Sequence, residues 1–193
     1  MESLIAILLL APLLFVPLLP MFLRYVQGTH AGDEAWKLAL FLFLGSAFFF
    51  IMIDLFTVPL HVTSGNGNLA LLVMAPAVVG IVLFATMVGI FVSRLLRRQG
   101  KALIRGFLLG DVLLLGLMII GEVWFVRDSL AQFDGEAGIL AAHLFRFGML
   151  NQYTNTLYFN MFTFLIPILI AALIGGVSAM EEARDTKRVE KML

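Results

Sequence analysis

Two carboxylates inside an apolar run of membrane length are the residues best suited to carry chemistry in this chain. Asp111 and Glu122 lie in residues 103–127, LIRGFLLGDVLLLGLMIIGEVWFVR. On an α-helix their spacing returns them to within roughly 20° of the same face, about 16 Å apart along the axis. Gly106 and Gly110 form a GxxxG pattern that lets another helix approach this one closely. We therefore expect the acidic face to meet protein or water rather than lipid.

The composition indicates a membrane protein. The chain is 61% hydrophobic and only 13% charged, with a mean hydropathy of +1.01, values outside the range of soluble domains. The absence of cysteine excludes disulfides, thiolate zinc sites and cysteine-ligated iron–sulfur clusters. No HExxH, GxSxG or Walker motif is present, so no catalytic or metal-binding residue is assigned from a motif.

The order of apolar and polar segments predicts an all-α, polytopic protein with five transmembrane helices. We expect these spans at residues 3–26, 35–60, 69–96, 103–127 and 154–180. A short interfacial helix is expected near residues 139–150, because His143 and Arg146 share one face of an otherwise apolar segment. The bundle is read as a single domain over residues 1–180, followed by a charged cytoplasmic tail at 181–193.

The distribution of basic residues predicts the orientation in the membrane. With five spans, most basic residues fall on one side, which the positive-inside rule identifies as the cytoplasm, and the N-terminus lies outside. The basic residues expected on the cytoplasmic side are Arg24, Lys37, Arg94, Arg97, Arg98, Lys101, Arg105, Arg184, Lys187, Arg188 and Lys191, against Arg127 and Arg146 on the other side.

Several polar residues are expected to meet in the outer half of the membrane. Counted along their helices, Asp54, Glu122 and Asn160 fall at a similar depth. Ionisable groups in a membrane are costly and usually face a cavity or a partner, so this cluster is a candidate ligand, quinone or proton site. The alternative is an ion-pair network that only joins the helices. The residues expected just above the cluster are His61, Arg127, His143 and Arg146.

Asp111 belongs to a deeper layer on the cytoplasmic side. Thr86 and Ser46 reach similar depths on other helices, and Arg24 could extend toward it. Without a cation beside it, a desolvated carboxyl favours its neutral form and donates a hydrogen bond. A proton relay from the outer cluster through Asp111 would need intervening water, because about 16 Å is too far for direct transfer.

The sequence limits the cofactors and partners that we consider. The five-helix layout is similar to that of respiratory cytochrome b subunits, in topology alone. Haem b inside the bundle is not expected, because His30, His61 and His143 all lie at or beyond helix ends. Quinone remains a candidate ligand. The basic turn from Arg94 to Arg105 is interpreted as a topology signal and a contact for anionic lipid, and nucleic acid is not expected as a partner.

Three classes of function are weighed. We favour a non-catalytic integral subunit of a larger, energy-converting assembly in a bacterial inner membrane, because small-residue faces such as Gly80/Ala85/Gly89 and Ala171/Gly175 exceed the needs of one small bundle. The alternative is a small, homo-oligomeric proton- or ion-coupled transporter or channel that uses the three intramembrane carboxylates as a relay. The third is a membrane-embedded enzyme with Asp54 and Glu122 as acid and base.

Overall fold

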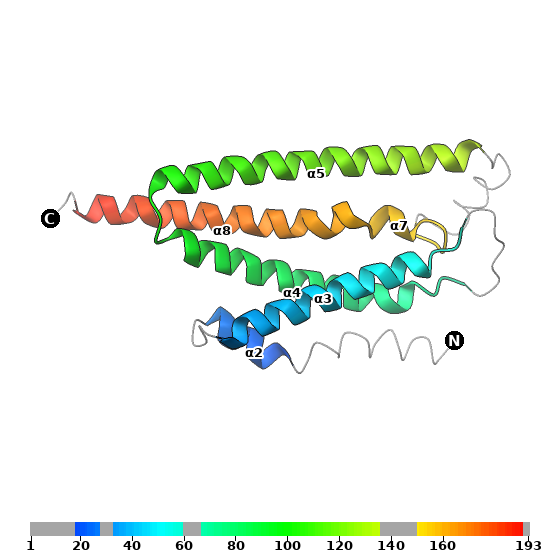
Figure 1. Cartoon of the computed structure of the whole chain (residues 1–193), viewed down its shortest axis with the longest axis horizontal. Coiled ribbons are helices and arrows are strands. Elements are labelled where there is room, and N and C mark those ends of the chain that lie inside the picture. Colours follow the sequence, from blue (N-terminus) through cyan, green and yellow to red (C-terminus); the bar gives the residue numbers. More distant parts are fainter. Residues whose placement is uncertain (1–17, 28–32, 60–66, 136–149, 191–193) are drawn as a thin grey trace.

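The fold is built from helices alone. A computed structural model describes residues 18–27, 33–59, 67–135 and 150–190, and these contain helices and no strand. The predicted all-α class is therefore confirmed. In chain order the helices are α2 (Leu19–Val26), α3 (Asp33–Leu55), α4 (Leu71–Leu96), α5 (Lys101–Gly135), α7 (Asn155–Tyr158) and α8 (Met161–Glu190) (Figure 1).

Four segments are long and apolar enough to cross a membrane, namely Ala35–Leu55, Leu71–Leu96, Lys101–Ala131 and Asn155–Ala183. They correspond to the second to fifth predicted spans, so the chain has the helices of a multi-pass membrane protein. The first predicted span, 3–26, lies mostly outside the described residues, and α2 is its C-terminal end. The interfacial helix predicted near 139–150 also lies outside them, apart from its last residue.

Three helix boundaries differ from the predicted ones. Helix α5 continues past Arg127 to Gly135, because no proline or glycine interrupts the polar segment between these two residues. Its 35 residues span about 52 Å, more than the roughly 30 Å of a bilayer core. Helix α8 likewise continues through the charged tail to Glu190. Helix α3 instead ends early, at Leu55, because Pro59 disfavours helical backbone just before it.

Helix α8 lies at the centre of the bundle. It packs against α4 on one side and α5 on the other, while α3 packs on α4 and α2 contacts both α3 and α4 (Figure 1). Among the described helices, α5 has its substantial contacts only with α8 and α7. Most of the surface of α5 is therefore not covered by the described residues.

Glycines allow the backbones of α4 and α8 to touch. A Cβ atom added at Gly89 would lie 2.7 Å from the carbonyl oxygen of Ala171. A Cβ atom added at Gly175 would collide with the carbonyl oxygen of Gly89 and lie 3.1 Å from the backbone nitrogen of Ser93. Helices in lipid associate through such close packing, because apolar burial supplies little driving force between them.

Glycines also shape the contact between α5 and α8. A Cβ atom at Gly176 would lie 2.8 Å from Cδ2 of Leu108, and one at Gly121 would collide with the ring of Phe162. Both small-residue faces of α8 are thus used inside the chain. On α8 these faces are therefore accounted for by its two neighbours, α4 and α5, and give no separate indication of an external partner.

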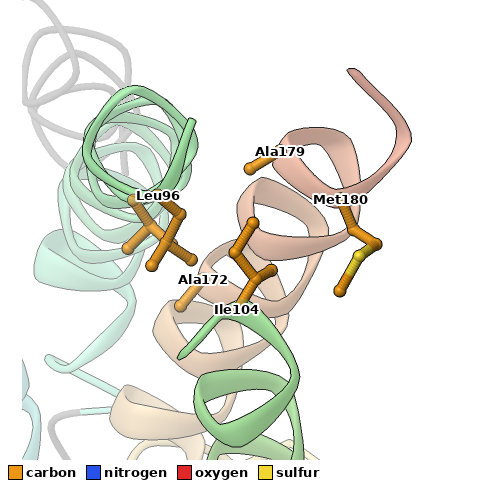
Figure 2. Packing of buried hydrophobic residues seen from close by; sticks show 6 residues of the cluster. Leu96, Ile104, Ala172, Ala179 and Met180 are labelled. Carbon is orange, nitrogen blue, oxygen red and sulfur yellow. The ribbon is translucent and has the colours of Figure 1, made fainter. Parts of the chain in front are cut away.

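A compact apolar cluster joins α4, α5 and α8 beside the basic turn. Ile104 of α5 is fully buried between Leu96 of α4 and Ala172 of α8, with Ala179 and Met180 above it (Figure 2). Two further clusters join α2 to α3 and α4, and α3 to α4 near the opposite end. The chain folds around α4 and α8, and α5 is attached mainly through α8.

We predict that Gly175→Ala destabilises the protein by about 1–3 kcal/mol, because the added methyl group must displace the backbone of α4. Thermal unfolding of the detergent-solubilised protein would measure the effect. Gly110→Ala is the matched control. A Cβ atom there meets nothing within 4 Å, so this substitution should be neutral or stabilise α5 by up to about 1 kcal/mol. Equal behaviour of the two variants would contradict the close α4–α8 contact.

Candidate functional site

Both carboxylates of α5 lie on the stripe that faces α8. The less exposed residues of this helix recur at alternating intervals of four and three, as in a heptad repeat. The predicted common face of Asp111 and Glu122 is therefore the packing face, turned away from the surrounding lipid. The stripe consists of Ile104, Leu108, Asp111, Leu115, Met118, Glu122 and Phe125.

Asp111 is buried at the middle of this interface. The contacts of Gly176 with Phe107 and of Gly121 with Phe162 share one antiparallel register, which puts Asp111 level with Ala172 of α8. Its side chain is 7% exposed, and its Oδ2 atom has no hydrogen-bond partner among the described residues.

The partners predicted for Asp111 are wrong. Thr86 donates to the carbonyl of Val82 at 2.8 Å, and Ser46 donates to the carbonyl of Leu42 at 2.6 Å, each within its own helix. Both residues lie on helices that α5 does not pack against, because α8 lies between. Arg24 is on α2, at the opposite edge of the bundle (Figure 1).

The predicted fifth span is interrupted near its start. The backbone of Phe159 has φ −128° and ψ 83°, which ends α7, and α8 begins two residues later. Asn160 caps α8: its Oδ1 accepts hydrogen bonds from the backbone N–H groups of Phe162 at 2.8 Å and Thr163 at 3.1 Å. The Thr163 hydroxyl in turn accepts from the Asn160 N–H at 2.8 Å. This reciprocal arrangement is a capping box.

Asn160 also connects the break to Glu122. Its Nδ2 donates to the carbonyl of Thr156 at 3.1 Å, and a side-chain hydrogen bond joins it to the Glu122 carboxyl. Because Oδ1 already accepts two backbone bonds, the amide nitrogen is the donor to Glu122. The second oxygen of Glu122, Oε2, is buried with no hydrogen-bond partner among the described residues. Two of the predicted site residues are thus in contact.

Aromatic rings of α3 hold the break in place. The ring of Phe50 lies 5.5 Å from that of Phe159 and 5.0 Å from that of Phe164, both in edge-on geometry. Such pairs stabilise a contact beyond their buried area. The interruption is therefore packed from one side by α3, while Glu122 approaches from α5.

A pair of asparagines beside the break was not predicted as part of the site. The Nδ2 of Asn68 donates to Oδ1 of Asn155 at 2.8 Å, and Nδ2 of Asn155 donates back at 2.9 Å. Asn155 is fully buried, and Asn68 also accepts from the N–H of Ala70 at 3.2 Å. In the sequence, Asn68 ends the polar stretch HVTSGNGN between the second and third predicted spans. The available signal was a second isolated asparagine in an apolar helix, which needs a partner.

The other predicted site residues are not brought to this point by the described chain. Asp54 is exposed in the last turn of α3, which ends at Leu55 instead of continuing to residue 60. Arg127 is exposed on α5. The remaining three, His61, His143 and Arg146, lie outside the described residues.

The arrangement at the break suits a polar ligand or a proton. The positive end of the α8 helix dipole and the amide of Asn160 favour negative charge, which Glu122 supplies. A carboxyl with one bonded and one unbonded oxygen can accept a further donor or hold a proton itself. The described residues contain no group of three or more His, Asp or Glu side chains placed to bind a metal ion.

Comparison with other proteins gives no further identification, since no protein-family model, characterised protein or solved structure matches this chain.

We predict that Asn160→Ala lowers stability by about 1–2 kcal/mol, because α8 loses its cap and Glu122 loses its donor. Asn160→Ser is the matched control, since a serine hydroxyl caps a helix equally well but is too short to bond Glu122 as well. Thermal unfolding should place the serine variant between the alanine variant and the original chain. A serine variant as unstable as the alanine variant would show that capping is not the main contribution.

Proposed function

We propose that this chain is a five-span integral subunit of a larger assembly in a bacterial inner membrane, of an energy-converting kind that handles protons or quinone. The observation that carries the proposal is the one-sided packing of α5. This helix has the length to cross the membrane completely, yet among the described helices it packs mainly against α8, with smaller contacts to α7 and, beside the basic turn, to α4. A partner helix would cover the opposite face.

The free face of α5 has the features of a helix–helix interface. It is a second stripe at heptad spacing, directly opposite the stripe that meets α8. If this face met only lipid, glycine would not be favoured there, because glycine destabilises a helix by about 1 kcal/mol relative to alanine. A GxxxG pair on an uncovered face instead permits close backbone approach. The stripe consists of Leu103, Gly106, Gly110, Leu113, Leu117, Ile120 and Trp124, all exposed.

The carboxylates support the energy-converting part of the proposal. Glu122 at the helix break and Asp111 at the centre of the α5–α8 interface are both largely buried, and each has an oxygen without a hydrogen-bond partner in the described chain. Intramembrane carboxylates with unsatisfied oxygens are typical of proton-handling or ligand sites.

A transporter or channel is the second candidate, favoured by the interrupted helix. Discontinuous transmembrane helices place backbone groups and helix termini at the binding sites of many transporters. Here the break brings Asn160 and Glu122 together in the span. This candidate predicts a homo-oligomer that carries protons or ions without other subunits.

We predict that Gly110→Phe removes the partner of α5 while leaving the chain folded, because residue 110 is exposed and a Cβ atom there meets no described residue within 4 Å. Val112→Phe is the matched control, since Val112 is exposed on a different face of the same turn. Native mass spectrometry of the protein, gently solubilised from its own membrane, would report the associated chains.

Co-purifying subunits that are lost only in Gly110→Phe would support the subunit role. A homo-oligomer without other chains would favour the transporter. A monomer that does not change with either variant would contradict both.

The orientation is proposed on the same basis as the predicted topology. Basic residues of the described chain gather at the end of the bundle that holds the α4–α5 turn and the start of α3, whereas Arg127 lies toward the other end of α5 (Figure 1). The positive-inside rule then makes the α4–α5 turn cytoplasmic. With residues 3–26 as the first of five spans, the N-terminus is outside.

Single cysteines in this cysteine-free chain provide the test. We expect Asn66→Cys to react with a membrane-impermeant maleimide in intact cells, and Gln99→Cys to react only after permeabilisation. Both positions are in polar stretches of the sequence between apolar runs, so neither substitution should disturb the bundle. The reverse labelling pattern would contradict the proposed orientation.

A further inference from the structure

An open groove runs between α4 and α8 and reaches the end of α2. Its volume is about 590 Å³, and it extends along α4 from Arg97 at the end of the bundle to Thr86, about 16 Å deeper. The deeper walls are apolar, with Ile90 on α4 and Ile174 on α8. The groove is therefore charged at one end and apolar over most of its length.

Arg94 is held in a fixed position at the charged end. Its terminal nitrogen NH2 donates to the carbonyl oxygens of Tyr25 at 2.9 Å and Val26 at 3.3 Å, which closes the last turn of α2. Its guanidinium carbon lies 4.9 Å from the centre of the Tyr25 ring, a cation–π contact. A guanidinium has five N–H donors, so these bonds leave several of them for another acceptor.

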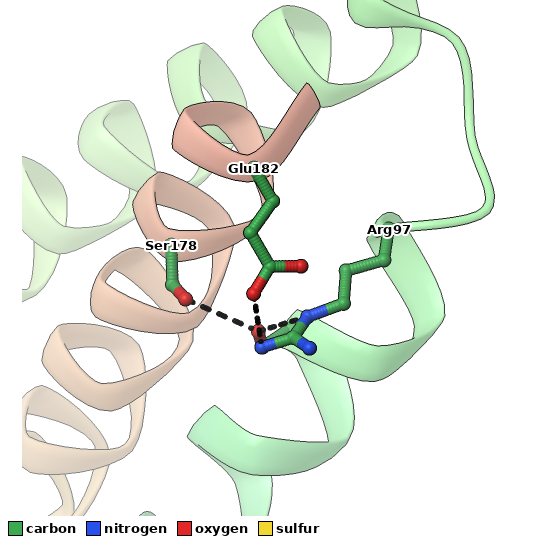
Figure 3. A network of polar contacts seen from close by, with 4 residues as sticks. Arg97, Ser178 and Glu182 are labelled. Carbon is green, nitrogen blue, oxygen red and sulfur yellow. Dashed lines mark hydrogen bonds and ion pairs between the residues drawn. The ribbon is translucent and has the colours of Figure 1, made fainter. Parts of the chain in front are cut away.

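Arg97 lies one turn further along α4 and also lines the groove. Its Nε donates to the hydroxyl of Ser93 at 3.3 Å, and its NH2 forms an ion pair with Glu182 at 2.8 Å (Figure 3). Ser93 in turn donates to the hydroxyl of Ser178 at 3.5 Å. The network joins α4 to α8 and orients the second guanidinium before any ligand is present.

The charges at this end favour an anion. Two guanidinium groups line the groove, and the ion pair with Glu182 involves Arg97, whereas Arg94 bonds backbone carbonyl oxygens of α2. Residues three apart on a helix share a face, so Arg94 and Arg97 can contact one anionic group together. Guanidinium groups bind phosphate with paired, charge-assisted hydrogen bonds.

We propose that this groove binds a phospholipid with an acidic headgroup. The phosphate bonds Arg94 and Arg97, and one acyl chain lies along the apolar walls past Ile90 and Ile174. A free phosphate would use the charged end alone, whereas the groove continues as apolar surface into the membrane-spanning part of both helices. Anionic lipid is also concentrated in the cytoplasmic leaflet, on the side to which the basic turn is assigned. This proposal requires the membrane placement of α4 and α8 and is independent of the subunit role.

Native mass spectrometry of the purified full chain would measure binding of phosphatidylglycerol and phosphatidylcholine with the same oleoyl chains. We expect phosphatidylglycerol to bind at least tenfold more tightly. The double variant Arg94→Gln, Arg97→Gln should lower its affinity about tenfold or more, because charge-assisted hydrogen bonds are lost. Arg105→Gln removes one charge at the same end of the bundle but outside the groove, and should change the affinity less than twofold.

A second pair of variants tests the acyl path without altering charge. Ile174→Trp fills the groove and should lower phosphatidylglycerol affinity while both arginines keep their bonds. Val177→Trp, on an exposed position of α8 that does not line the groove, is its control. This pair remains informative if the double arginine variant loosens α2.

Three results would overturn the proposal. Equal binding of the two lipids would exclude selection by an acidic headgroup. Unchanged binding in both the arginine and the Ile174→Trp variants would place the lipid elsewhere. Loss of bound phosphatidylglycerol on adding millimolar inorganic phosphate, with Ile174→Trp unaffected, would identify a free-anion site with no acyl path.

Discussion

The backbone contact between α4 and α8 is the interaction on which the rest of the bundle depends. Helices in lipid gain little from burying apolar side chains, so their association requires close approach. Gly89 and Gly175 provide it, with a carbonyl of one helix lying where a side chain of the other would be. Helix α3 packs mainly on α4, and α5 packs mainly on α8. The central pair of α4 and α8 therefore links these two outer helices.

The same constraint explains where polar side chains are found. A helix that ends within the membrane leaves backbone groups that water cannot satisfy, so side chains must do so. Asn160 satisfies the N–H groups at the start of α8, and Arg94 satisfies the carbonyl groups at the end of α2. Each charge also matches the helix dipole: Glu122 approaches a helix N-terminus and Arg94 a C-terminus. Both candidate sites therefore arise at helix ends.

Periodicity predicted the fold well because it depends on local sequence. The all-α class, the four long apolar helices and the common face of Asp111 and Glu122 all follow from apolar run length and from 3.6 residues per turn. The same periodicity did not predict which helices lie next to one another. Depth along a helix put Asp111 level with Thr86 and Ser46, but depth does not say which helices touch, and α8 separates α5 from the helices that carry them. The end of α3 was misplaced for a local reason, since the helix stops at Leu55, before Pro59.

Asn160 and Asp111 differ in their hydrogen-bond partners, and this difference distinguishes a structural role from a functional one. Asn160 makes bonds to α8, to Thr156 and to Glu122, so its presence is explained by the fold alone. Asp111 makes no comparable bond: its Oδ2 is buried beside α8 with no partner in the described chain. Replacing such a group with an apolar one of similar shape costs a folded protein little or nothing. Stability therefore gives no reason for a carboxylate at residue 111, and this supports the proton-handling role that we propose.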